Sequence, residues 1–228
     1  MAKPRHPWRL AGLLLAAVTA FGCNVMSLPF FLMTGMDPKH EPKCKLASAD
    51  KEKEVKVVIL TASHLDGRPE FLRADFDLGV MLERHIKIGF ANNKERVTVI
   101  STAKVEKYKN DHPNWRRMGP AEIGRHFGAD YVIDLELNDL NLYELGSGNQ
   151  LYRGKGEIGL QVVDVNKADD PPKYEETYTP LYPKTRGPIA VSDSNFSQFR
   201  QAFLNQCAKE LSWRFTAHPT SDDFSCSD

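Results

Sequence analysis

The chain of 228 residues is 41% hydrophobic and 26% charged, a composition that suits one sizeable globular domain with a buried core. Its 30 basic and 30 acidic residues give a formal net charge of zero. Without Lys3, Arg5 and Arg9, the only charges in the first 22 positions, 27 basic and 30 acidic residues would remain, a net charge of −3. This near-neutral charge gives no electrostatic basis for nucleic-acid binding, so we expect no nucleic-acid partner.

The N-terminus has the order of an export signal. Residues 1–9 are basic, residues 10–21 are apolar, and small residues follow. This apolar core is too short to cross a bilayer, which needs about 20 residues. We therefore predict that residues 1–22 form a signal peptide and that the rest of the chain faces the periplasm or the exterior of a cell envelope.

Three interpretations of this segment are open. The sequence AFGC at positions 20–23 resembles the lipobox of bacterial lipoproteins, although its first two residues depart from the usual leucine and small residue. We favour this interpretation, in which Cys23 carries lipid and ties the chain to a membrane. The alternatives are cleavage after Ala20 and an uncleaved signal anchor within the uncharged run 10–36. All three place the body outside the cytoplasm.

The residues that follow Cys23 divide into two parts. An uncharged stretch reaches to Met36, and it can either lie in the lipid interface beside an acyl chain or pack on the domain. Residues 37–54 are charged and contain proline, with almost nothing to bury, which predicts a flexible tether. We therefore assign residues 23–54 to a lipid anchor and tether.

Three further cysteines are present: Cys44, Cys207 and Cys226. Cys207 falls on the apolar face of a predicted helix, which favours a small buried side chain. Cys44 in the tether and Cys226 in the polar tail are expected to be free to meet, and an oxidising compartment permits a disulfide between them. No Cys-x-x-Cys spacing occurs, so neither a zinc site nor a thioredoxin-type site is predicted.

The first half of the body alternates strands with helices. Residues 55–60 are apolar and β-branched, which predicts a strand buried on both faces. Apolar side chains at helical spacing predict a helix over residues 70–90, and residues 97–100 predict a second strand. A short helix is predicted over residues 120–127, with a proline in its first turn and Gly128 at its end.

The second half is predicted to be a β-meander followed by a long helix. Residues 129–138 alternate between apolar and polar, which indicates a strand with one solvent-exposed face. The alternation shifts beyond Asp139, which indicates a bulge or a bend. Strands are also predicted at residues 151–165 and 174–179. The last helix begins near Ser194 and has one apolar face, formed by Phe196, Phe199, Phe203, Cys207, Leu211 and Phe215.

The predicted order of elements is β-α-β-α-β-β-β-α. Such an order favours an α/β fold, similar to an α+β arrangement, with helices packed on a mixed sheet. We assign this domain to residues 55–217 and expect residues 218–228 to form a polar tail.

This run of elements resembles a group of bacterial envelope proteins. Three stretches carry the resemblance: residues 96–101 (RVTVIS), 121–133 (AEIGRHFGADYVI) and 160–165 (LQVVDV). They are similar to the TolB amino-terminal, CsgG and LpoB-like fold, over about residues 55–215. The resemblance implies a periplasmic or lipid-anchored protein that acts through protein contacts in secretion, envelope assembly or synthase activation. It implies no enzymatic activity and supplies no catalytic residues.

A membrane pore of the CsgG type is not expected. Such a pore needs added membrane hairpins with about 9–11 residues in each strand. The nearest candidates, residues 129–138 and 151–165, are already needed for the core sheet.

One stretch places catalytic residue types together. Ser63, His64 and Asp66 follow the first predicted strand at its carboxyl end, where ligands often bind in α/β sheets. Adjacent side chains on an extended strand diverge, so Ser63 and His64 are poorly placed to hydrogen-bond. We favour a polar turn here. The alternative is a small periplasmic hydrolase that uses His64 and Asp66.

The remaining candidate sites are weaker. His85 lies on an apolar helix face, and His112 and His126 lack partners at metal-ligand spacing. The glycines of residues 154–159 lie within a predicted strand and open no helix, which argues against a phosphate loop and indicates a bend. Calcium would need more oxygen ligands than the acids of residues 75–77 supply.

The same shortage of ligands applies to Asp134 and Glu136, so we expect neither a metal nor a cofactor. Four aromatic residues are candidates either for partner contacts or for core packing: Tyr174, Tyr178, Tyr182 and Trp115.

Our principal hypothesis is an exported, lipid-anchored and non-enzymatic protein that acts through protein contacts at the envelope, with an unidentified envelope protein as its partner. A signal-anchored accessory subunit of a transporter is a further alternative.

Overall fold

The computed structural model describes residues 38–50, 52–65 and 67–221. The predicted signal peptide and Cys23 lie outside the described residues, and so do Asp66 and Cys226. The predictions made for them are therefore not tested by the structure.

Three parallel strands form one half of the main sheet. The central strand is β2 (Val55–Ser63), which pairs with β3 (Val97–Val99) on one side and with β4 (Tyr131–Tyr143) on the other. All residues of β2 are buried except Lys56 and the last residue, Ser63, because helices cover both faces of this strand. The prediction of a doubly buried first strand is confirmed.

The other half of the sheet is antiparallel. Strand β5 (Leu151–Asp164) pairs with β4, and β6 (Tyr174–Tyr178) pairs with β5, which gives the order β3-β2-β4-β5-β6. Two short strands, β7 (Leu181–Tyr182) and β8 (Ile189–Ala190), also pair with β5. The register of β4 against β5 shifts between Leu137 and Asp139, which confirms the predicted bulge.

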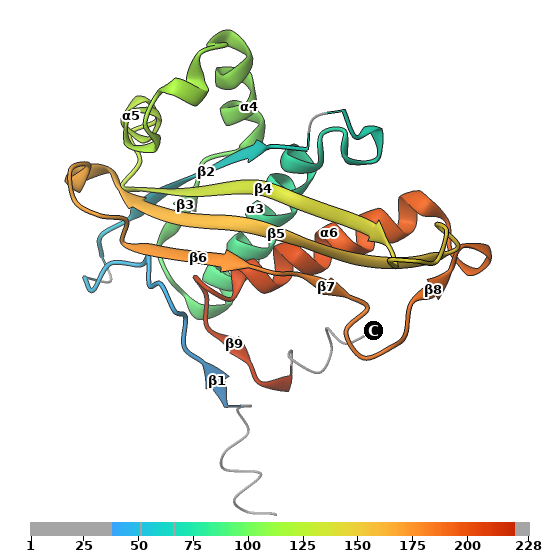
Figure 1. The fold of residues 1–228 in the computed structure, drawn as a ribbon. Coiled ribbons are helices and arrows are strands. Elements are labelled where there is room, and N and C mark those ends of the chain that lie inside the picture. Colours follow the sequence, from blue (N-terminus) through green and yellow to red (C-terminus); the bar gives the residue numbers. More distant parts are fainter. Residues whose placement is uncertain (1–37, 51, 66, 222–228) are drawn as a thin grey trace, which may run out of the picture. The chain divides into compact units, whose positions relative to one another are not determined.

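Helices cover the two faces of the sheet unequally (Figure 1). The long helices α3 (Ala74–Asn93) and α6 (Phe196–Ser212) pack on one face and enclose the larger core. The shorter helices α4 (Thr102–Asp111) and α5 (Pro120–His126) lie on the opposite face, over β2 and the start of β4. The structure thus has the expected α/β architecture of helices on a mixed sheet.

In the described part of the chain, the connections include four single-turn 3-10 helices: η1 (Pro69–Phe71), η2 (Trp115–Arg117), η3 (Val165–Lys167) and η4 (Val191–Asp193). The turn η1 lies between β2 and α3, and η2 lies between α4 and α5. Both contribute residues to the end of the sheet where the parallel strands finish.

Helix α4 is absent from the predicted order of elements. Its sequence, TAKVEKYKND, contains few apolar residues, and only Thr102, Val105, Tyr108 and Lys109 of the helix are buried. So few apolar residues give only a weak helical periodicity, and the sequence therefore does not predict the helix. Packing against the sheet stabilises it in the fold. The last helix ends at Ser212, although Phe215, beyond it, is buried as expected.

Part of the segment predicted to be a tether belongs to the folded domain. Cys44 and Leu46 are buried in the larger core, and the Cys44 backbone N–H donates to the Arg214 carbonyl at 2.8 Å. Strand β1 (Lys39–His40) pairs with β9 (His218–Pro219), so the predicted polar tail also starts with a paired strand. The prediction that residues 37–54 bury almost nothing is wrong for Cys44 and Leu46, because these two apolar residues were too few to show a pattern.

Candidate functional site

The carboxyl end of β2 is the natural place for a site in this sheet. Strand β2 is followed by α3 on one face, and β3 is followed by α4 and α5 on the other. The connection after β2 and the connection after β3 therefore run to opposite faces of the sheet. Where neighbouring connections diverge in this way, a crevice forms at the carboxyl ends of the parallel strands.

The predicted catalytic residues do not assemble at this end. The Ser63 hydroxyl oxygen accepts a hydrogen bond from the Leu65 N–H at 3.2 Å, which closes a local turn. His64 Nε2 lies 4.0 Å from Glu136 Oε2, longer than a hydrogen bond, and both side chains are about half exposed. Within the described part of the stretch, Ser63 and His64 do not hydrogen-bond to each other, as the divergence of neighbouring side chains predicts.

A cavity of about 450 Å³ lies beside this turn. It is bounded by the end of β2, the loop that leads to α3, the first turn of α3, and Arg116 of η2. Leu65, Phe71 and Leu72 provide apolar surface, and the Leu72 side chain is 76% exposed. A volume of this size is in the range that small-molecule sites occupy.

Three arginines line the cavity, and they differ in their partners. Arg68 is neutralised, because its guanidinium pairs with Asp139 at 3.0 Å and with Glu70 at 3.5 Å. Arg73 and Arg116 have no carboxylate partner among the described residues. No sequence motif singles out these arginines, and Arg116 lies far along the chain from the other two.

A buried lysine pairs with two acids, one of which, Asp75, lines the cavity. Lys109 Nζ lies 3.6 Å from Asp75 and 2.8 Å from Glu106, and it donates to the Thr61 carbonyl at 3.0 Å. The Lys109 side chain is only 7% exposed, and burying its charge is tolerable because these groups replace water. Asp75 is thus an ion-pair partner of Lys109.

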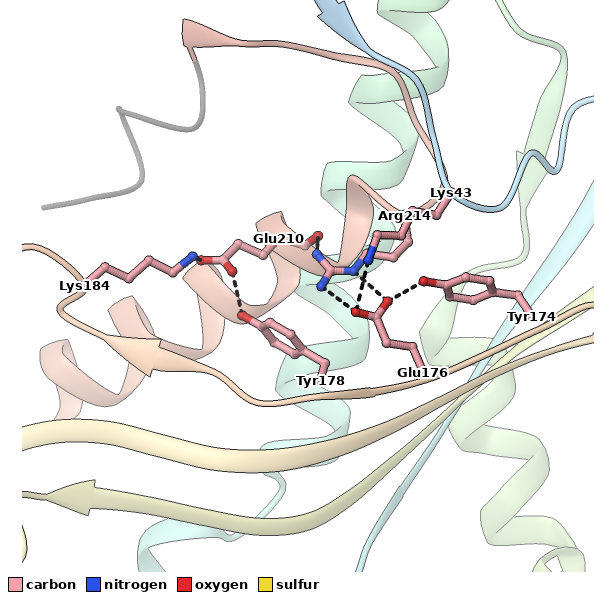
Figure 2. A network of polar contacts seen from close by, with 7 residues as sticks. All are labelled: Lys43, Tyr174, Glu176, Tyr178, Lys184, Glu210 and Arg214. Atoms are coloured by element: carbon pink, nitrogen blue, oxygen red, sulfur yellow. Dashed lines mark hydrogen bonds and ion pairs between the residues drawn. The ribbon is translucent and has the colours of Figure 1, made fainter.

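A second polar cluster lies beside the strand β6, at the end of the strand order (Figure 2). Glu176 of β6 pairs with Arg214, just beyond α6, at 3.0 Å and with Lys43 at 3.4 Å, and it accepts a hydrogen bond from the Tyr174 hydroxyl. Burial alone would raise the pKa of the Glu176 carboxyl, but the hydrogen bonds from Arg214 and Tyr174 and the nearby positive charges outweigh burial and hold the pKa at about 2.

The same cluster contains a buried glutamate. Glu210 of α6 accepts a hydrogen bond from the Tyr178 hydroxyl at 3.0 Å and pairs with Lys184 at 2.7 Å (Figure 2). Burial raises the pKa of the Tyr178 hydroxyl, so Tyr178 stays neutral as a hydrogen-bond donor. These contacts join β6 to α6 and to the segment around Lys43, which identifies the cluster as structural.

The candidate aromatic contacts are mainly core residues. Tyr178 is buried, and Tyr174 and Tyr182 pack partly buried against the larger core. Trp115 packs against the smaller core and contacts two cations, with Lys109 Nζ 4.9 Å and the Arg116 guanidinium carbon 5.4 Å from its ring centre.

Three histidines singled out in the sequence contact amide or aromatic side chains. His85 Nε2 lies 2.9 Å from Asn205 Oδ1 and joins α3 to α6, while the His112 ring stacks on Tyr108 and the His126 ring contacts Tyr108 at a tilt. Over the described ranges, no group of three or more His, Cys, Asp or Glu residues is arranged to hold a metal ion.

The acids of β4 lie on the sheet face that α4 and α5 cover only in part (Figure 1). Burial and the neighbouring Glu136 raise the pKa of the Asp134 carboxyl to about 6. With Glu175, these two acids border a hollow of about 170 Å³ in which Gly159 leaves the space of a side chain.

The glycines of β5 serve close packing. A Cβ atom on Gly154 would lie 2.3 Å from Phe203, and one on Gly156 would lie 2.3 Å from the Asp139 carbonyl oxygen beside the bulge. Both residues lie within β5, so the argument against a phosphate loop is confirmed.

Two of the cysteines are buried. Burial raises the pKa of both the Cys44 and the Cys207 thiol, and Cys207 is fully enclosed on α6 as expected. The Cys44–Cys226 disulfide and the lipid on Cys23 stay predictions, since Cys23 and Cys226 lie outside the described residues. Across residues 38–50, 52–65 and 67–221, no helix has both the length and the hydrophobicity to span a bilayer.

Comparison with known proteins gives distant structural likenesses. No family model matches the chain, and neither does any curated protein. Among solved structures, a PelC dodecamer from Paraburkholderia phytofirmans that carries one substitution is 14% identical, covers 78% of this chain and 99% of its own, and has a TM-score of 0.42.

Two further structures are similar to the same degree. Lipoprotein GNA1162 from Neisseria meningitidis is 12% identical, covers 68% of this chain and 98% of its own, and has a TM-score of 0.41. Protein XCC0632 from Xanthomonas campestris, of family DUF330, is 11% identical over 78% of this chain and 90% of its own, with a TM-score of 0.37. Likenesses this distant carry no argument about function, and the resemblance to the TolB amino-terminal, CsgG and LpoB-like fold stays a prediction.

Proposed function

We propose that the chain is an exported envelope protein, anchored by lipid on Cys23, that acts without catalysis through contacts with other envelope proteins in assembly, secretion or transport. The observation that carries the proposal is the order of the first 23 residues: a basic start, a short apolar core and a cysteine after small residues. The folded unit then begins at Lys39, so about 15 residues separate the proposed lipid from the domain.

The geometry at the end of β2 supports a role in binding. The hydroxyl of Ser63 is engaged in a turn, His64 has no carboxylate at hydrogen-bond distance among the described residues, and the adjacent cavity presents arginines. A hydrolase would need a nucleophile and a base in contact, oriented by a third group. The alternative of a hydrolase that uses His64 and Asp66 therefore draws no support from the described residues.

The proposal is tested by detergent-phase partition of the full chain, expressed with its leader in a bacterium that processes lipoproteins. We expect the wild type to enter the detergent phase and the Cys23→Ala variant to shift toward the aqueous phase, because acyl chains supply most of the membrane affinity. Cys44→Ala is the matched control and should partition like the wild type. Equal partition of wild type and Cys23→Ala would contradict lipid attachment at Cys23.

A further inference from the structure

We propose that the face of β4, β5 and β6 that points away from α3 and α6 binds a basic segment of a partner protein. This open face consists of the outward side chains of residues 134–138, 157–161 and 175–177, all of which the structure describes. The proposal rests on the proposed role in protein contacts and deepens it, because it names a surface and the chemistry of its partner. It does not depend on lipid at Cys23.

Most of the open face has no helix over it in the described part of the chain. Helices α3 and α6 pack on the other face of these strands, and α4 and α5 lie over β2 and the start of β4 (Figure 1). The outward side chains of Glu136, Glu157 and Glu175 are exposed, while their neighbours in the strands point to the other face. A partner can therefore reach this side of the sheet.

The charge of the open face is not balanced. Its three segments, DLELN, EIGLQ and EET, contain no lysine or arginine, and their outward acids are Asp134, Glu136, Glu157 and Glu175. Among the described residues, only Glu136 has a basic side chain as near as 4.0 Å, which is the half-exposed His64. A surface with an excess of negative charge attracts a partner with positive charges and disfavours one with negative charges.

The cations that border the open face have acids of their own. Arg153 and Lys155, farther along β5, share Glu144 at 3.7 Å and 3.2 Å. Arg68 pairs with Asp139 at 3.0 Å, just beyond the bulge in β4. With these three cations and their two acids included, this side of the sheet still has an excess of negative charge.

The strand register gathers the acids around a hollow. Asp134, Gln161 and Glu175 lie directly across from one another on three neighbouring strands, and Glu136 lies opposite Gly159 in the next row. Because Gly159 has no side chain, a hollow of about 170 Å³ opens between these polar groups. Its polar lining suits the end of one lysine or arginine side chain.

Asp134 is held in an unfavourable place when it is ionised. Burial and Glu136 raise the pKa of its carboxyl to about 6, and no positive charge among the described residues offsets them. A lysine or arginine from a partner would stabilise the ionised carboxyl, because an opposite charge nearby favours the charged form. The acid that weakens the free domain thus strengthens the complex.

The arrangement of the acids favours a protein segment over a metal ion. A hard cation such as calcium needs several oxygen ligands that converge on one point. Over the described ranges, no group of three or more His, Cys, Asp or Glu residues is arranged in that way. The acids instead extend across three strands, so several basic side chains of one segment can each reach a carboxylate.

The test is a calorimetric titration of the full chain in neutral detergent micelles with a capped peptide of alternating lysine and serine, about seven residues long. We expect saturable binding that weakens with added sodium chloride, and no saturable binding of the same peptide with glutamine in place of lysine. Glu136→Gln and Glu175→Gln should each weaken binding about threefold, and the two together about tenfold, because single exposed ion pairs are weak.

Two further variants separate charge from shape. Asp193→Asn is the matched control, because Asp193 is an exposed acid of η4 outside the open face and its change removes the same charge. Gly159→Val leaves the charge unchanged but fills the hollow, and it should weaken binding about threefold or more. Thermal unfolding of each variant shows whether the domain remains folded.

The outcomes decide the proposal in either direction. Absence of saturable binding of the lysine peptide to the wild type would overturn it, and so would equal losses in Asp193→Asn and Glu136→Gln. Self-association in sedimentation experiments that Glu136→Gln abolishes would also overturn it, since a second copy of the chain would then be the occupant. None of these results depends on lipid at Cys23, which the detergent partition tests separately.

Discussion

The Arg214 guanidinium donates two hydrogen bonds to the Glu176 carboxylate, from Nε to Oε2 at 3.2 Å and from Nη2 to Oε1 at 3.0 Å. This paired geometry is the strongest form of a charge-assisted contact. It fastens the edge strand β6 to the residues that follow α6, and the Arg214 carbonyl in turn holds the backbone of Cys44.

The change Glu176→Gln should lower the free energy of unfolding by about 2 kcal/mol at pH 7, because the Arg214 charge loses its partner in a mostly buried place. Since the pKa of Glu176 is lowered to about 2, its stabilisation is present above the ordinary value of 4.5 and disappears as the pH falls toward 2. Urea unfolding of both proteins at several pH values measures this difference.

Glu175→Gln is the matched control for that change, because Glu175 is the exposed neighbour on the same strand. A control that costs as much as Glu176→Gln, or a difference that persists unchanged down to pH 2, would contradict the role of the pair.

Leu46→Ala should destabilise the domain by about 2–4 kcal/mol, since Leu46 is 1% exposed within the core and its removal leaves a cavity. Leu145, 89% exposed after β4, provides the control, and Leu145→Ala should change stability by less than about 0.5 kcal/mol. Chemical denaturation compares the two variants. Equal effects would show that the segment around Leu46 does not pack on the domain.

Gly154→Ala should destabilise by about 1–3 kcal/mol, because the added methyl group would overlap the Phe203 ring. Gly187→Ala, at a position where an added Cβ meets no atom within 4 Å, should be nearly neutral. A second change, Phe203→Leu, should make Gly154→Ala less costly than it is in the wild type, and a double-mutant cycle measures that coupling. Strict additivity of the two changes would argue against direct contact.

Asp134→Asn should stabilise the domain at pH 7.5 by about 1–2 kcal/mol. Burial and Glu136 raise the pKa of Asp134 from 3.8 to about 6. The protonated carboxyl is therefore favoured in the folded domain, and the domain loses stability as the pH rises through 6 and the carboxyl ionises; below pH 3.8 there is no such loss. The gain from the asparagine should therefore be absent at pH 3.5. Unfolding at the two pH values measures it, and a gain of equal size at both would contradict the assignment.

Much of the sheet could be predicted from the sequence, because its strands have strong patterns. The continuous apolar run of residues 55–60 and the alternation of residues 129–138 correspond to β2 and β4. Helix α4 and the burial of Cys44 and Leu46 could not be predicted. These segments contain too few apolar residues to form a pattern, and their packing depends on the surface that the rest of the fold provides.

The sequence indicates where the candidate site lies but not which residues form it. Ligands often bind at the carboxyl end of such a strand, although the sequence favours a polar turn there, and the cavity lies beside that turn. The arginines that distinguish it, Arg73 and Arg116, come from the start of α3 and from η2, and their stacking on Phe76 and Trp115 has no signature in sequence spacing.

The N-terminal peptide of the protein extracted from membranes tests the central claim most directly. Intact-mass and fragment spectra should show a chain that begins at Cys23 with the added mass of a diacylglycerol group on its thiol. A chain that still begins at Met1, or an unmodified Cys23, would contradict a lipid-anchored envelope protein.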